Sequence, residues 1–107
     1  MNPVEEQLLA YNDRDLERFV SVYAPDVVFE NGENKLLIKG LDQIRKDYGN
    51  MFATYPELHC KVISRINVGD YVVDEEEITG RGSPTPMRAV VIYRVSGDKI
   101  VHVRILR

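Results

Sequence analysis

The hydrophobic pattern of this chain changes from helical to alternating spacing near residue 58, and this change restricts its possible folds more than any other feature. Before that point, apolar residues recur at intervals of three and four, as in amphipathic helices. After it, apolar and polar residues alternate through long segments separated by short turn sequences. Helices followed by a run of strands indicate an α+β domain.

The first half of the chain is predicted to contain helices and one β-hairpin. The expected helices span residues 4–11, 14–23 and 41–54. Asp13 is the predicted cap of the second helix, and Pro25 is expected to end it because a proline disfavours helical geometry in the preceding residue. Residues 27–30 and 35–38 flank Asn31-Gly32, which adopts the positive φ angles of tight turns and therefore predicts a hairpin.

The second half is predicted to form an antiparallel meander. Its expected strands span residues 58–68, 70–80, 86–96 and 99–106. Short connections between long neighbouring strands favour this topology. Because long strands twist, such a sheet rolls around the helices into a half-open cone.

Composition agrees with a single globular domain over residues 1–107. Hydrophobic residues make up 44% of the chain and charged residues 29%. The net charge is −3 without a basic stripe, so no nucleic-acid partner is expected. One cysteine, Cys60, excludes an internal disulfide, and no secretory or membrane-spanning pattern is present, which together predict a cytoplasmic protein without membrane contact.

Several short motifs resemble the nuclear transport factor 2-like superfamily, in particular its SnoaL-like and ketosteroid-isomerase-like members. The matching segments are residues 11–17 (YNDRDLE), 23–28 (YAPDVV), 39–44 (KGLDQI), 55–58 (YPEL), 78–80 (ITG) and 96–100 (SGDKI). The resemblance covers essentially the whole chain. It implies one SnoaL-like domain with a strongly curved antiparallel or mixed sheet wrapped around N-terminal helices, the cystatin-like α+β roll. It implies little about activity, because this fold hosts many functions.

The resemblance argues against ketosteroid isomerase activity itself. That reaction needs a carboxylate base, and a tyrosine and a protonated aspartic acid that hold the enolate oxygen. On this sequence, the three catalytic positions of the isomerase carry Gln7, Asn31 and Val91. None of these side chains supplies the required chemistry.

Alternation along the strands assigns side chains to two faces of the sheet. The apolar sets that should face the helices are Met87, Ala89, Val91, Tyr93 and Val95, with Val101, Val103 and Ile105. Aligned by resemblance, the set Val72, Asp74, Glu76 and Ile78 also falls on the pocket side. Glu75 and Glu77 then share the outer face with Arg88, where opposite charges make favourable cross-strand pairs.

Asp74 and Glu76 are therefore the candidate catalytic residues. Two residues apart on one strand, they would lie on the same face, and in a dry pocket one of them would retain a proton near neutral pH. The alternatives are that residues 74–77 form a solvated charge run at a strand end, or that structural partners neutralise the inner pair. The expected ligand-binding residues are Tyr11, Glu30, Asn31, Tyr48, Tyr55, Val91, Tyr93 and Val103, although a turn role for Glu30 and core roles for the tyrosines are alternatives. Neither a metal site nor a cofactor is predicted.

The outer face of the sheet carries aliphatic and aromatic residues among its charges, which predicts that a second subunit covers it. The residues of this expected homodimer surface are Tyr71, Val73, Val90, Ile92, Arg94 and Arg104. A monomer with scattered exposed apolar residues is the alternative.

Three interpretations remain open from the sequence. The first, which we favour, is a protein that binds a small, largely apolar molecule in the cone, with its activity unassigned. The second is a non-catalytic dimeric association module, and the third is an acid–base enzyme of isomerase or cyclase type that acts through Asp74 or Glu76. An apolar pocket of roughly several hundred Å³ with an inward carboxylate would favour the binding and enzyme interpretations, and a cone filled by its own side chains would favour the module.

Overall fold

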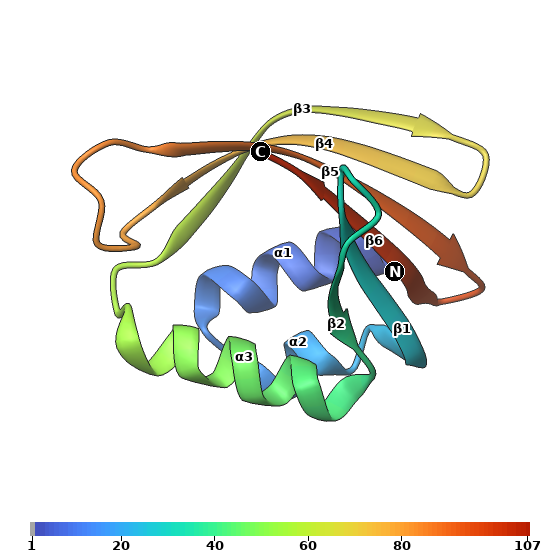
Figure 1. Ribbon diagram of the computed structural model, residues 1–107, viewed down its shortest axis with the longest axis horizontal. Helices are drawn as coiled ribbons and strands as arrows, with labels where there is room; N and C mark the ends of the chain where they lie inside the picture. Colours follow the sequence, from blue (N-terminus) through green and yellow to red (C-terminus); the bar gives the residue numbers. More distant parts are fainter. Residues whose placement is uncertain (1) are drawn as a thin grey trace.

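The computed structural model describes residues 2–107, in which helices pack on the concave face of a curved sheet (Figure 1). The helices are α1 (Pro3–Asp13), α2 (Leu16–Val20) and α3 (Leu41–Thr54). The strands are β1 (Tyr23–Asn31), β2 (Leu36–Lys39), β3 (His59–Val68), β4 (Tyr71–Thr79), β5 (Met87–Ser96) and β6 (Lys99–Leu106). The cone-like α+β architecture predicted from the sequence is confirmed.

The sheet has six strands in the order β2-β1-β6-β5-β4-β3. The predicted antiparallel meander forms its β3 to β6 portion. The first hairpin joins the same sheet because β1 pairs in parallel with β6, with Phe29 beside Val103. This parallel pair places the aromatic side chain of Phe29 against the concave face of the meander.

The first two helices differ from the prediction. The Asn2 side chain caps α1 by accepting from the Val4 amide at 2.9 Å, and α1 ends where Arg14 takes a left-handed conformation (φ 53°). Asp15 then caps α2, which stops at Val20. The prediction of a helix over residues 14–23 capped by Asp13 is therefore wrong.

Sheet pairing explains why this helix is short. The Ile100 amide donates to the Val22 carbonyl at 2.8 Å, and Tyr23 pairs with Ile100. The chain has therefore joined the sheet before it reaches Pro25, which lies inside β1 and does not end a helix.

The turn between β1 and β2 is held by a side chain. The Asn31 Oδ1 accepts from the amides of Glu33 at 2.8 Å and Lys35 at 3.0 Å. The positive φ angle predicted for Asn31-Gly32 is found at Asn34 instead (62°). An Asx-type turn therefore closes this loop.

Burial confirms the predicted faces of β4 and β5. Val72, Asp74, Glu76 and Ile78 alternate as buried residues on β4, and Ala89, Val91 and Tyr93 do so on β5. On the outer face, Arg88 Nη1 lies 2.9 Å from Glu75 and its Nε lies 3.4 Å from Glu77. The predicted cross-strand charge pairs are present.

Irregularities in β3 and between β5 and β6 change which residues face inward. Val62 pairs with Glu76, but Ser64 pairs with Glu75, so the extra residue brings Arg65 opposite Asp74. A second shift lies where β5 meets β6. There Ile100 is fully buried, whereas Val101, expected in the core, is half-buried.

Exposed apolar side chains gather on the outer face near the β3–β4 turn. Ile66, Val68 and Tyr71 are 57%, 65% and 48% exposed. Within residues 2–107, none of the helices has the length and apolar character needed to cross a membrane.

Candidate functional site

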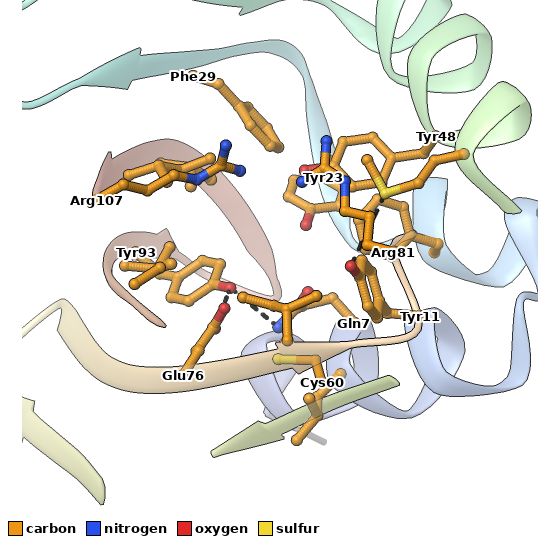
Figure 2. Close-up of a pocket in the computed structure, with 18 residues that line it drawn as sticks. Gln7, Tyr11, Tyr23, Phe29, Tyr48, Cys60, Glu76, Arg81, Tyr93 and Arg107 are labelled. Carbon is orange, nitrogen blue, oxygen red and sulfur yellow. Dashed lines mark hydrogen bonds between the residues drawn. The ribbon is translucent and has the colours of Figure 1, made fainter. Parts of the chain in front are cut away.

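A cavity lies between the helices and the concave face of the sheet (Figure 2). It holds about 60 Å³ of free space. Its wall consists of Gln7, Leu8, Tyr11, Phe19, Tyr23, Phe29, Tyr48, Met51, Cys60, Glu76, Ile78, Arg81, Ala89, Val91, Tyr93, Val103, Ile105 and Arg107. We call this space the inner cavity.

A wider cleft of about 440 Å³ adjoins the inner cavity on the α3 side. The residues common to both walls are Phe29, Tyr48, Met51, Arg81, Ile105 and Arg107. The cleft adds Asp47 and Tyr55, among other residues. The inner cavity is thus the inner end of a hollow that opens along α3, and the cleft is its mouth.

Aromatic rings form one wall of the inner cavity. The ring centroids of Phe19 and Tyr48 are 4.6 Å apart, and Tyr11 meets Phe52 edge to face at 5.6 Å. Burial raises the pKa of the Tyr11 and Tyr48 phenols, so both stay neutral at physiological pH. This wall presents apolar faces with a few neutral hydroxyl groups.

Glu76 is the carboxylate of the inner cavity. Its side chain comes from β4 and is 6% exposed. The Tyr93 hydroxyl donates to Glu76 Oε2 at 3.1 Å, and Gln7 Nε2 donates to the Tyr93 Oη at 3.2 Å (Figure 2). Within residues 2–107, no cationic side chain forms an ion pair with Glu76.

The environment of Glu76 favours its protonated form. Burial, followed by the negative charge of Asp74, raises the pKa of Glu76 from 4.5 to about 7, against the opposing effect of the Tyr93 hydrogen bond. A carboxyl group with such a pKa is present in both protonation states near neutrality. It can therefore donate or accept a proton there.

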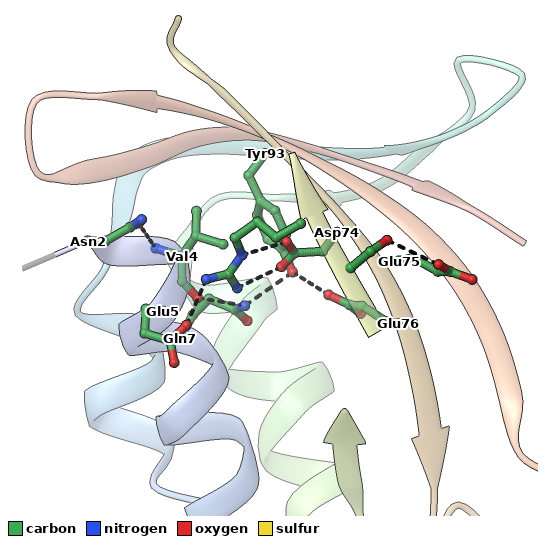
Figure 3. A network of polar contacts seen from close by, with 10 residues as sticks. Asn2, Val4, Glu5, Gln7, Asp74, Glu75, Glu76 and Tyr93 are labelled. Carbon is green, nitrogen blue, oxygen red and sulfur yellow. Dashed lines mark hydrogen bonds and ion pairs between the residues drawn. The ribbon is translucent and has the colours of Figure 1, made fainter. Parts of the chain in front are cut away.

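Asp74 lies in a different environment although it is only two residues away. It is fully buried, and Arg65 binds it through Nε–Oδ1 at 2.7 Å and Nη2–Oδ2 at 2.9 Å. Arg65 also reaches Glu5 of α1 at 2.7 Å, and Figure 3 shows Asp74 and Glu5 within this network. Asp74 is absent from the described walls of the inner cavity and the cleft.

The structure separates the predicted ligand-binding residues into three groups. Tyr11, Tyr48, Val91, Tyr93 and Val103 line the inner cavity. Tyr55 lines only the cleft. Glu30 and Asn31 lie elsewhere.

Glu30 and Asn31 are at the end of β1, and neither lines the inner cavity or the cleft. Glu30 pairs on the outer face with His102 at 2.5 Å and Arg104 at 3.5 Å, and the His102 hydrogen bond lowers the Glu30 pKa. Asn31 closes the hairpin turn and borders a separate groove beside Leu106. Glu30 follows the inward-facing Phe29 and pairs beside Arg104, so alternation along β1 places it on the outer face.

Sequence reasoning did not assign Cys60, Arg81 and Arg107 to the site. Arg107 continues the inward parity of Val103 and Ile105, so alternation could have placed it there. Arg81 follows Gly80, whose approach to another loop is visible only in three dimensions. Burial raises the pKa of the Cys60 thiol, which is therefore a neutral wall group.

The family model for the SnoaL-like domain matches residues 4–103 of this sequence. The chain belongs to the SnoaL-like domain family. A search of curated proteins gave no match. Within this SnoaL-like domain, the positions implied by ketosteroid isomerase hold Gln7 and Val91 in the cavity wall and Asn31 outside it.

Solved structures confirm the fold. An uncharacterized cystatin-fold protein from Novosphingobium aromaticivorans is 28% identical, with a TM-score of 0.90 over 100% of this chain and 99% of the other. A candidate polyketide cyclase from Sinorhizobium meliloti is 17% identical (TM-score 0.82; 96% and 92% covered). A protein with a ketosteroid isomerase-like fold from Catenulispora acidiphila, solved with trimethylamine, is 19% identical (TM-score 0.76; 96% and 82% covered).

Proposed function

We propose that this SnoaL-like protein binds a small, largely apolar molecule in the cone and that Glu76 exchanges a proton with it. One observation carries the proposal: Glu76 is a buried carboxyl group without a cationic partner in the described chain, and it faces a cavity lined mainly by aromatic and aliphatic side chains. A purely structural carboxylate would be expected to have the kind of partner that Asp74 has in Arg65.

The dimensions of the hollow indicate how a ligand would lie. The inner cavity, with about 60 Å³, accepts only a small group beside Glu76. The cleft, with about 440 Å³, accommodates the remaining body of the molecule. The reacting end would therefore lie next to Glu76, with the rest of the ligand extending towards α3.

The chemistry suited to this arrangement is proton transfer at carbon next to a carbonyl group. Ionised Glu76 would remove the proton, and the resulting carboxyl group would return it to another carbon or to the same one. The Tyr93 hydroxyl, held by Gln7, would adjust its hydrogen bond as Glu76 changes charge. Such steps occur in isomerases and cyclases, whereas the specific substrate depends on the cleft.

Binding is tested with the neutral fluorescent probe N-phenyl-1-naphthylamine. Val91→Phe fills the inner cavity and should weaken probe binding by about tenfold, because the added ring occupies the space that the probe needs. Val90→Phe places the same ring on the outer face of β5 and serves as the matched control. Thermal unfolding verifies that both variants are folded. Equal affinities in the two folded variants would contradict binding in the cone.

Proton transfer is tested with acetophenone in deuterium oxide, by NMR detection of deuterium at its methyl carbon. The wild type should accelerate exchange over buffer, and Glu76→Gln should return the rate to the background. Glu75→Gln removes a neighbouring carboxylate from the outer face and should retain the wild-type rate. Acceleration that survives Glu76→Gln would exclude Glu76 as the base.

A further inference from the structure

Arg81 and Arg107 are two cationic side chains that share the passage between the inner cavity and the cleft. Both line the two spaces, Arg81 from the loop after β4 and Arg107 from the residue after β6 (Figure 2). In the part of the chain that the structure describes, neither guanidinium group makes a hydrogen bond or an ion pair. By contrast, Arg65 and Arg88 both bind carboxylates of their neighbouring strand.

The acidic groups near this passage do not neutralise the two arginines. Asp47 lines the cleft and Glu76 lines the inner cavity, but within residues 2–107 neither forms an ion pair with Arg81 or Arg107. Two guanidinium groups without a carboxylate partner in the described chain therefore border this passage, and a ligand with one negative group would pair with them.

We infer that the ligand is amphipathic, with an apolar body and one anionic oxyacid group, such as a carboxylate or sulfonate, bound between Arg81 and Arg107. This inference rests on the proposed function, because it concerns the same hollow. The planar guanidinium group donates paired hydrogen bonds that match the geometry of such anions.

The position of the carboxyl groups sets the orientation of this ligand. Glu76 lies in the wall of the inner cavity, where its ionised form would repel a second anion. Arg81 and Arg107 lie where the inner cavity opens into the cleft. The anionic group therefore occupies the mouth, and the uncharged end of the ligand points to Glu76.

Two fluorescent probes of matched shape test the inference. N-phenyl-1-naphthylamine is neutral, and 8-anilino-1-naphthalenesulfonate is the same skeleton with one sulfonate. In Arg81→Gln and Arg107→Gln, the affinity for the sulfonate should fall by about five- to tenfold each, as expected for loss of a partly exposed charged hydrogen bond, while the affinity for the neutral probe should stay within about twofold. High salt should weaken sulfonate binding selectively.

The control variant is Lys46→Gln, which removes one positive charge from an exposed position of α3 outside both walls. It should leave both affinities unchanged. Val91→Phe should weaken both probes, which separates binding in the cone from binding on the surface.

The outcomes distinguish the two levels of the proposal. If the arginine variants weaken both probes equally, or if neither arginine variant weakens sulfonate binding, the anionic ligand class is overturned. Binding of an apolar molecule in the hollow is not affected by either result. Failure of the neutral probe to bind the wild type would contradict the proposed function itself. Sulfonate binding that Val91→Phe does not change would assign the sulfonate to the surface and overturn the inference.

Discussion

Asp74 and Glu76 point to the same side of β4, yet Arg65 binds the carboxylate of Asp74, whereas Glu76 accepts a hydrogen bond from the neutral Tyr93 hydroxyl. The charge of Asp74 is compensated locally and also disfavours ionisation of its neighbour. The first carboxylate thus connects β4 to β3 and, through Arg65, to α1, and the second supplies the titratable group of the cavity.

Ionisation of Glu76 should make stability depend on pH. Its folded-state pKa, raised from 4.5 to about 7, means that the folded protein binds more protons than the unfolded chain between these values. The free energy of unfolding should therefore fall as pH rises through this range, by about 3 kcal/mol for this group, and become level above it.

Urea denaturation at pH 5 and pH 8 measures this effect. Glu76→Gln should remove most of the difference in the free energy of unfolding between pH 5 and pH 8 that Glu76 contributes. Glu75→Gln should show the same pH dependence as the wild type. An unchanged pH dependence in Glu76→Gln would show that Glu76 ionises normally in the folded state.

Loss of Arg65 should destabilise the fold strongly. Arg65→Gln leaves the fully buried Asp74 without its bidentate partner, so we expect a loss of about 3 to 5 kcal/mol in the free energy of unfolding. Arg88→Gln breaks the exposed pair with Glu75 and should cost about 1 kcal/mol or less. Chemical denaturation compares the two, and similar small effects would contradict the structural role of the Asp74–Arg65 pair.

Gly80 should tolerate no side chain. It has a φ of +75°, and an added Cβ would lie 2.0 Å from the Glu57 carbonyl oxygen, so Gly80→Ala should lose at least about 2 kcal/mol of stability. Gly97 shares the positive φ (+62°) but has open space around it, and Gly97→Ala should lose about 1 kcal/mol. Melting curves compare the stability lost in the two variants. A smaller loss in Gly80→Ala than in Gly97→Ala would contradict the prediction.

Dimerisation through the outer face stays a prediction. Tyr71 is 48% exposed and, with half-buried Ile92, belongs to the expected surface. If a second copy covers this face, Ile92→Glu should shift the protein from dimer to monomer, because the new charge would be buried. Leu36→Glu, at a 54% exposed position of β2, is the control. Light scattering at micromolar concentration reports the mass, and a monomeric wild type would refute the prediction.

Local sequence patterns were sufficient to predict the α+β class, the meander and the inward face of β5, whereas the inward face of β4 was assigned by resemblance to the family. Alternation of apolar residues determines the face of β5, since a strand must bury one face against the helices. The predicted cavity residues Tyr93, Val91 and Val103 follow from the same rule. Where the pattern was uninterrupted, it placed side chains on the correct face.

The tertiary structure decided the features that depend on interruptions and on distant partners. The bulge in β3 after Val62 reverses the parity of that strand and turns Arg65 towards Asp74, so one carboxylate is neutralised and the other is left for the cavity. The parallel pairing of β1 with β6 shortens α2 and brings in Phe29. These outcomes arise from backbone hydrogen bonds between segments far apart in sequence, and a local hydrophobic pattern contains no record of them.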